Sequence, residues 1–560
     1  MSPISSPHSL FGPASPGEPA LREAAAIPAS QSRYCYLFPH LAKEDRVGCF
    51  AGTTPAETFD RLKTFEQASR TPLSGLPVLP MRLPAVYTYF GQFVNHDISA
   101  PVGDVVTRPD PPEAVGVIVS TDPPGLDRAR RARAEIILKH FVNEQPDPLS
   151  LDSLYGDADG PFSADPRVRA LYEADGKRFR LGVTRREADQ VFRDLLKNPR
   201  LVHHETGARD MLRLDGAPLI ADHRNDENLV VSQLHLALLL FHNKAVARME
   251  GESGTAQECF AAARQLVRLH YHWLILHDFL RNLLSRTVLA VPWADRPPGL
   301  AAARSVPLEF TTAAFRFGHS MVGASYDFNA NFGLGAHLGP EGATLRQLFD
   351  FTSHRNMGKP GTATLQLPDH WVIDWDRMTR PTGQTAIGGA EKIDLSFAPG
   401  MLTAMGMQHA VEHGSILFRN LMRGFHRRIP FGQALAQEYG LDPLEAGEIK
   451  AALPDGHVDG PQSRTLRAVA EELGMLGETP AWLYFLCEAR LREGGERIGP
   501  AASQIIADTI VGLMRHMPTS ILNHAGGTWH PRQSPLKDGD DAGLTSIRKL
   551  LIFAVKDTHI

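Results

Sequence analysis

Residues 229–249 read LVVSQLHLALLLFHNKAVARM, and apolar side chains recur in this stretch on every face of a helix. A second stretch of the same kind, CFAAARQLVRLHYHWLILHDFLRNLL, covers residues 259–284. Helices that are apolar all round are buried, so this pair predicts two long helices at the centre of the core. Strand-like alternation is limited to short pieces such as VGVIVS at 115–120, so we predict a mainly α fold with little β structure. Further helical patterns occur at 309–322, 400–424, 431–439, 464–474 and 501–515.

The rest of the chain divides by composition around these helices. Residues 1–30 are rich in Pro, Ser and Ala and predict a flexible arm. Residues 31–84 predict an N-terminal extension, which ends in an extended connector rich in Pro and Leu at 71–85. We expect one large domain over 85–525 and a C-terminal tail over 526–560. Clusters of Gly and Pro predict loops at 286–300, 334–345 and 379–400.

The composition argues against several classes of protein. A formal net charge of −5 is small for 560 residues, which gives little support to nucleic-acid binding. The most basic stretch, RARRARAE at 128–135, predicts a solvated helix face. No secretory signal and no membrane-spanning run is recognisable, so we expect a cytoplasmic protein or one exported by a leaderless route. Reduced thiols are expected for the four cysteines, which lie far apart without a CxxC pair: Cys35, Cys49, Cys259 and Cys487.

Charged residues stand directly before the first apolar helix, in the segment ADHRNDEN at 221–228. Arg224 and Glu227 lie three residues apart there, so both would enter the core with the helix. Burying an unpaired ion costs several kcal/mol, so such charges must be paired or functional. The alternative is that they are ordinary charges at a helix start, where the helix dipole acts on them.

Two further segments each present a histidine in an apolar setting. In YTYFGQFVNHDIS, at 87–99, Gln92 and His96 are four residues apart and share one helix face. In EFTTAAFRFGHSMV, at 309–322, His319 lies among aromatic residues next to Gly318, where something flat could approach an imidazole. Such a setting suits a haem-ligating histidine. Taken singly, each histidine is more simply explained as a hydrogen-bonded residue of the core.

In this order, the three segments resemble the animal-type haem peroxidases of the peroxidase-cyclooxygenase superfamily, here as a bacterial member. The family's GQ-x-x-x-HD motif matches residues 91–97, its R-x-x-E unit matches Arg224 and Glu227, and its FR-x-GH motif matches the segment that ends at His319. Its LN-x-x-R segment matches RNLMRGFHRRIP at 419–430. The similarity extends from about Gly75 to about Leu522.

The resemblance implies a haem enzyme with His319 as the iron ligand beneath the porphyrin. Asn420 would accept the Nδ1 proton of His319, and Phe315 and Arg316 of the same motif would contact the cofactor. On the opposite side, His96 would move the protons of hydrogen peroxide. There, Arg224 would stabilise the developing charge, and Gln92 lies where the family binds small anions.

The enzyme implied by this family reduces hydrogen peroxide through a ferryl intermediate. Its small-molecule electron donors would be phenols, thiocyanate or halides, and a role in the response to oxidative stress would follow. Mammalian members attach haem through two carboxylates, and here the first position is Asn95, which cannot form an ester. We therefore expect haem b held without a covalent bond, or by a single ester to Glu227.

The family also binds calcium, through the aspartate after the distal histidine and a loop that ends in YG. Asp97 and the loop PLSLDSLYG at 148–156 resemble these parts, with Ser150 and Asp152 as oxygen ligands. The loop departs from the family pattern, because Ser150 replaces its usual first aspartate. A simple turn is therefore the alternative to a calcium site.

Two other functions compete with the peroxidase. Fatty-acid dioxygenases of the same superfamily form a radical on a tyrosine three residues before the proximal histidine, where this chain has Arg316. A haem-free metal-binding or interaction protein is the other candidate, although no HExxH motif occurs. The histidines that motivate it are His203, His204, His270, His272 and His277.

Overall fold

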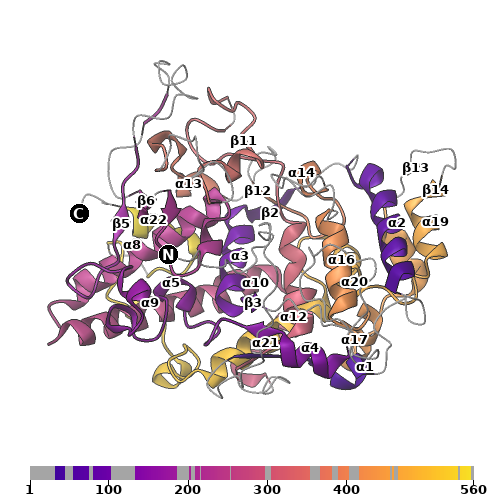
Figure 1. Ribbon diagram of the computed structural model, residues 1–560, viewed down its shortest axis with the longest axis horizontal. Helices are drawn as coiled ribbons and strands as arrows, with labels where there is room; N and C mark the ends of the chain where they lie inside the picture. Colours follow the sequence, from indigo (N-terminus) through magenta and orange to yellow (C-terminus); the bar gives the residue numbers. More distant parts are fainter. Residues whose placement is uncertain are drawn as a thin grey trace, which may run out of the picture.

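The computed structural model describes most of the chain and is dominated by helices (Figure 1). The described residues are 32–43, 55–74, 80–102, 133–185, 201–203, 209–214, 216–252, 254–296, 304–333, 335–353, 366–380, 389–402, 415–454, 457–458, 464–539 and 543–556. The helices among them are α1 Pro39–Lys43, α2 Pro55–Ser74, α3 Val86–Ile98, α4 Ala134–His140, α5 Asp152–Tyr155, α6 Pro166–Arg169, α8 Leu229–Met249, α9 Ala256–Leu274, α10 Leu280–Leu283, α11 Arg286–Leu289, α12 Leu308–Thr312, α13 Trp375–Met378, α14 Pro399–Leu402, α16 Ile416–His426, α17 Gly432–Glu438, α18 Ala446–Ala452, α19 Leu466–Glu472, α20 Ala481–Glu493, α21 Pro500–His516 and α22 Ile547–Val555.

The two long apolar stretches form the helices that the sequence predicts. α8 begins where the side chain of Asn228 caps the backbone N–H of Val231, and α9 begins at a reciprocal cap between Thr255 and Glu258. The second stretch continues beyond α9 as a π-helical turn, Ile275–Phe279, before α10. Such turns redirect the side chains that follow them. Here the turn holds Asp278 against Tyr87 of α3.

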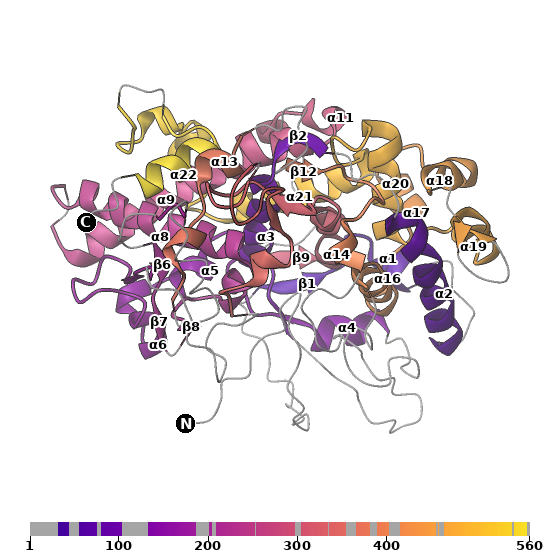
Figure 2. The same cartoon turned by 90° about the horizontal axis from the view of Figure 1, so that it is seen from above.

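α8 is buried along most of its length. Of the described helices, it is the one long and apolar enough to cross a membrane by length and composition. In the fold, however, 89% of its most apolar stretch lies inside the protein, between α9, α3 and α22. The C-terminal segment thus contributes to the core through α22, as Figure 2 shows beside α8 and α9.

α3 lies in the middle of the molecule, between α8 and the segment that carries His319 (Figure 1). That segment was expected to be one helix over 309–322, and this detail is wrong. α12 ends at Thr312, because Ala313 has the non-helical angles φ −128° and ψ −64°. A 3-10 helix, Ala314–His319, follows and presents its aromatic residues and His319 toward α3.

The strands are short, and several of them pair segments that are far apart in the sequence. Among the described residues, the largest sheet has four strands in the order β3-β4-β1-β9, with β1 parallel to β9 and antiparallel to β4. β2 pairs with β12, so the predicted connector at 71–85 is in part the end of α2 and in part a strand. The strands are β1 Arg33–Cys35, β2 Pro80–Pro84, β3 Pro101–Val102, β4 Val142–Asn143, β5 Leu181–Gly182, β6 Asp210–Met211, β7 Arg213–Leu214, β8 Ala217–Pro218, β9 Ser305–Pro307, β10 Ser325–Tyr326, β11 Ala343–Thr344, β12 Gly389–Glu391, β13 His457–Val458 and β14 Arg464–Thr465.

Several other helical expectations are confirmed in outline. α17, α19 and α21 fall within one or two residues of the predicted 431–439, 464–474 and 501–515. The predicted 400–424 is represented by α14 and α16. The arm at 1–30, the strand at 115–120 and most of the basic stretch at 128–135 lie outside the described residues.

Candidate active site

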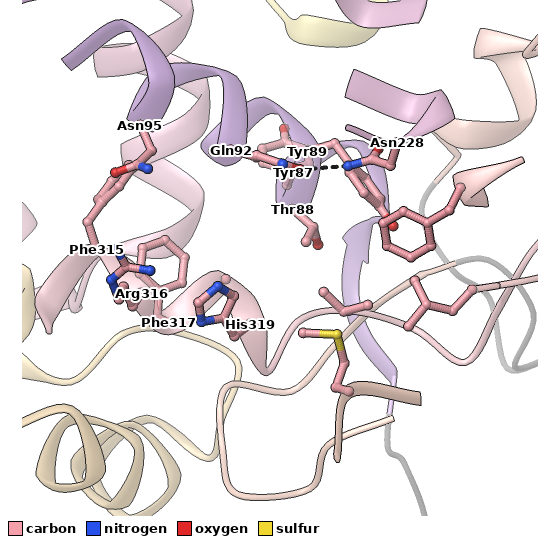
Figure 3. A pocket seen from close by; sticks show the side chains of 16 residues that line it. Tyr87, Thr88, Tyr89, Gln92, Asn95, Asn228, Phe315, Arg316, Phe317 and His319 are labelled. Carbon is pink, nitrogen blue, oxygen red and sulfur yellow. Dashed lines mark hydrogen bonds between the residues drawn. The ribbon is translucent and has the colours of Figure 1, made fainter. Parts of the chain in front are cut away.

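A cavity opens between α3 and the 3-10 helix that ends at His319 (Figure 3). The empty space inside it, its open mouth included, is about 760 Å³. Figure 3 shows His319 facing open space, with Gln92 and Thr88 of α3 on the other side. The lining residues are mostly apolar and aromatic: Tyr87, Thr88, Tyr89, Gly91, Gln92, Asn95, Asn228, Phe315, Arg316, Phe317, Gly318, His319, Val322, Leu345, Phe349 and Met401.

His319 is held by the asparagine that the sequence nominates. The side-chain amide nitrogen of Asn420, on α16, lies 3.0 Å from Nδ1 of His319, while Oδ1 of Asn420 has no hydrogen-bond partner. Turning the amide by 180° exchanges its two ends, so that Oδ1 accepts a proton from Nδ1. In that tautomer the lone pair of Nε2 points away from Asn420 and is available to a metal.

The surroundings of His319 keep its imidazole neutral. Burial lowers the pKa of His319 well below its ordinary value, and the cations Arg316, Arg423 and Arg419 lower it further. A neutral imidazole is the form that ligates a metal. The site therefore provides a metal ligand without competition from a proton at neutral pH.

Arg316 brings a buried positive charge to the same cavity, and no described carboxylate is paired with it. Its Nε donates to the carbonyl of Thr311 at 2.9 Å, while its Nη1 is buried and has no hydrogen-bond partner among the described residues. Burial, together with Arg427, lowers the pKa of Arg316 to about 9, so the group stays cationic at neutral pH. Since a buried cation requires an anionic partner, Arg316 fits a carboxylate of a bound ligand, such as a haem propionate.

The neutral His319, the unpaired Arg316 and the flat aromatic walls of the cavity together fit a haem group. Phe315 and Phe317 stand next to them, with ring centroids 5.5 Å apart. The predicted cofactor residues His319, Asn420, Arg316 and Phe315 are therefore brought together, across 105 positions of sequence from Phe315 to Asn420.

His96 lies on α3 just outside the lining of the cavity. Its Nδ1 is 2.9 Å from Oδ1 of Asn225, and its Nε2 is buried and has no hydrogen-bond partner in the part of the chain that the structure describes. The amide nitrogen of Asn225 in turn lies 3.1 Å from Nδ1 of His235, so one asparagine joins two buried histidines. Burial and the charge of Arg224 lower the pKa of His96 to about 3. His96 is thus a buried, neutral imidazole, one nitrogen of which is bound to Asn225.

The structure does not bring Arg224 into the cavity. Its guanidinium is 4% exposed and forms an ion pair with Asp222, with 2.5 Å between Nη2 and Oδ2. It also donates to the carbonyls of His96 and Ser99, at 2.9 and 2.7 Å. Ser99 is the C-cap residue of α3 and His96 lies in the last turn of that helix, so Arg224 binds the C-terminal end of α3. The expected stabilisation of charge on peroxide has no counterpart in this geometry.

This arrangement predicts that Arg224 contributes to stability. Burial alone would raise the pKa of Asp222, but Arg224 outweighs it and holds the pKa well below its usual range. Arg224→Met leaves that carboxylate buried and unpaired, so we expect a loss of ~3–5 kcal/mol in the free energy of unfolding, measured by urea denaturation. The double variant with Asp222→Asn should recover most of the loss. A stable Arg224→Met protein that no longer reacts with peroxide would instead support a catalytic role.

The other predicted residues on this side of the cavity lie close to α3. Gln92 and Asn95 line it. Glu227 lies next to it, and its Oε2 accepts a hydrogen bond of 3.2 Å from Gln92. Asn228 also lines the cavity and donates to Oε1 of Gln92 at 3.0 Å, as Figure 3 shows, although the sequence analysis did not single it out. Its place as the residue before the long apolar helix was the available signal.

The expected calcium ligands are close together but are bound to protein groups. Asp97 accepts hydrogen bonds from the backbone of Leu151 and from Oγ of Ser153. Asp152 is paired with the guanidinium of Arg264 at 2.9 Å, and Ser150 accepts from the backbone of Asp152. No group of three His, Cys, Asp or Glu side chains in the described part of the chain could hold a metal ion. The arrangement does not fit calcium, because Arg264 already supplies the cation.

The histidines that motivated a haem-free metal site are separate from one another. His270 bonds to Oγ of Ser534 at 2.8 Å, and His272 bonds to the carbonyl of Leu149 at 2.9 Å. His203 bonds to Asp369, and His277 stacks on Trp273. These contacts are those of ordinary core and surface histidines. His204 lies outside the described residues.

Fold and site together give a mainly helical protein with a cavity whose residues fit a haem group, and comparisons with known proteins point in the same direction. Residues 180–356 match the family model for animal haem peroxidases. Peroxidase A from Dictyostelium discoideum has a similar structure, with a TM-score of 0.50 at 16% identity over 82% of this chain and 85% of that one. No curated protein sequence matches. Over residues 180–356 the chain is thus similar to the animal haem peroxidases, and over most of its length it has a fold like that of the Dictyostelium protein.

A second solved structure shows how widely the fold is shared. The fatty acid alpha-dioxygenase of Arabidopsis thaliana has a TM-score of 0.50 at 12% identity, over 82% of this chain and 71% of that one. At such identities the similarity shows the fold alone. It is therefore compatible with both a peroxidase and a dioxygenase.

Proposed function

We propose that this protein is a haem peroxidase, which reduces hydrogen peroxide and oxidises a small-molecule donor. The observation that carries the proposal is that one aromatic cavity beside α3 is lined both by a neutral His319 and by the buried cation Arg316, which has no described anionic partner. The first supplies an iron ligand and the second a partner for a propionate. We expect haem b, held without a covalent bond or by one ester to Glu227.

In this proposal the protein handles protons while the bound haem supplies the redox centre. The imidazole of His96 is neutral, and its Nε2 has no hydrogen-bond partner among the described residues. In the proposed reaction, Nε2 takes a proton from one peroxide oxygen and delivers it to the other. Asn225 holds the opposite nitrogen and thereby fixes the orientation of the ring. The amide of Gln92, held by Asn228, provides a neutral polar contact for peroxide or a small anion.

The cavity also favours a class of donor. Val322, Leu345, Phe349 and Met401 line it, so a planar apolar donor loses contact with water on entering. Phenols meet this description better than halides do. Thiocyanate and halides would have to rely on the few polar groups near Gln92.

A fatty-acid dioxygenase is the second candidate, because the fold is shared with one. In this chain, the position three residues before His319 is Arg316, which cannot form the tyrosyl radical that the resemblance associates with dioxygenases. We expect no oxygen uptake when the haem-loaded protein is mixed with linoleate and dioxygen without peroxide. With peroxide and a phenol, the same preparation should turn over. Uptake of oxygen on linoleate alone would contradict the peroxidase.

A further inference from the structure

Tyr87 is a cavity residue with an unusual partner. Its hydroxyl donates to Oδ1 of Asp278 at 2.6 Å, and its ring lines the cavity that contains His319. A distance of 2.5–2.7 Å is typical of a hydroxyl bound to an ionised carboxylate. The two residues are 191 positions apart in sequence and meet through the π-helical turn after α9.

In the other hydrogen bonds that the described residues make to Asp278, its carboxyl group is also the acceptor, as suits an ionised carboxylate. Asn282 donates to Oδ1 at 3.0 Å, and the backbone N–H of Ile547 donates to Oδ2 at 2.7 Å. Both oxygens therefore accept, and neither needs to carry a proton. Burial raises the pKa of the Asp278 carboxyl above its ordinary value, although these bonds oppose the effect. Asp278 is thus a buried base in contact with a phenol.

A phenol next to a base can lose an electron and a proton together. Burial and the charge of Asp278 raise the pKa of Tyr87, so its hydroxyl keeps its proton in the resting protein. Removal of an electron makes a phenol strongly acidic. A base already bonded to the hydroxyl takes up the proton without any rearrangement, which lowers the free energy of the oxidised, neutral product.

We propose that Tyr87 is a redox-active residue, oxidised by the peroxide-oxidised haem that the proposed function implies. One electron passes from the ring of Tyr87 to the oxidised haem, which is thereby reduced by one equivalent. The O–H bond breaks, its proton goes to Oδ1 of Asp278, and a neutral tyrosyl radical remains at the wall of the cavity. A phenolic donor there restores Tyr87 by giving one electron to the radical and its own proton to water, while Asp278 returns the proton it holds to the tyrosine oxygen. This proposal rests on the proposed peroxidase function.

Tyr89 provides a matched comparison on the same helix. It also lines the cavity, but its neighbour is the phenol of Tyr326, whose ring centroid is 5.8 Å away. A second phenol is a far weaker base than a carboxylate. Tyr87 is therefore the tyrosine whose oxidation is assisted, and Tyr89→Phe is the control for Tyr87→Phe.

The test is electron paramagnetic resonance of the haem-loaded protein, frozen within seconds of adding peroxide. We expect a tyrosyl signal that narrows when the tyrosines are ring-deuterated, that persists in Tyr89→Phe and that falls at least tenfold in Tyr87→Phe. Asp278→Asn, which keeps the shape but removes the base, should also weaken it. Haem content and circular dichroism report whether each variant is folded.

The outcomes separate this proposal from the proposed function. An unchanged signal in Tyr87→Phe, or no tyrosyl signal in a wild-type protein whose haem absorption responds to peroxide, would overturn the role of Tyr87 alone. No response of the haem absorption to peroxide would overturn the peroxidase and, with it, this proposal.

Discussion

His319→Ala is expected to remove the haem absorption band of the purified protein. The substitution deletes the neutral imidazole that faces the cavity, and no second histidine lines the cavity among the described residues. Iron would lose its protein ligand, and peroxidase activity would fall with the cofactor. An absorption spectrum with pyridine haemochrome analysis measures cofactor identity and stoichiometry together.

Two companion measurements make this prediction sharper. Imidazole added to His319→Ala should restore part of the absorption band, because it can occupy the space that the side chain vacates. Asn420→Ala should retain haem more weakly, with a loss of about 10 to 100-fold in affinity or activity, as is usual for partners of metal ligands. A His319→Ala protein with the stoichiometry and spectrum of the wild type would show that the iron ligand lies elsewhere.

His96→Ala should have the opposite pattern, with normal haem content and slow reaction with peroxide. A placed acid-base histidine typically contributes about 10² to 10⁴ in rate. Stopped-flow absorption at varied peroxide concentration would measure this second-order rate constant. His96→Gln, which keeps a polar side chain but cannot titrate, is the matched variant and should be equally slow.

The pH dependence provides an independent check on His96. Because its pKa is lowered to about 3, the neutral form that accepts a proton persists as the pH falls below 6.5. The rate constant for peroxide should therefore stay flat from pH 7 down to about pH 4 and decline only nearer pH 3. A decline centred near pH 6.5 would show that His96 titrates as an exposed histidine and is not the buried group described above.

Local sequence predicted much of the fold and part of the site. α8 was predicted at 229–249 and has those bounds, because a long run of apolar side chains can be satisfied only by a buried helix. The extension of α9 into a π turn was not predicted. A helix accommodates an extra residue in a π turn only where its tertiary contacts allow it. Here the turn contacts Tyr87 of α3, which is far away in the sequence.

The motifs identified which residues gather at the cavity but not how each is used. His319, Asn420 and Arg316 meet as the resemblance implies. Arg224 was expected at the cavity and instead pairs with Asp222, two residues away in the sequence. Its side chain is long enough for either arrangement, so the choice depends on where the end of α3 places its free carbonyls. The same holds for Asp152, which Arg264 of α9 neutralises.

By itself, the sequence determined the class of fold, the central helix and the histidine that faces the cavity, since these depend on apolar periodicity and short motifs. Only the tertiary structure decided which charges are paired, that Nε2 of His96 is left free, and that a phenol of α3 meets the carboxylate of Asp278. The physical reason is that ion pairs and proton acceptors are defined over a few ångströms in space. Tyr87 and Asp278 lie within hydrogen-bonding distance although they are 191 positions apart, whereas residues that are neighbours in the sequence can point away from each other.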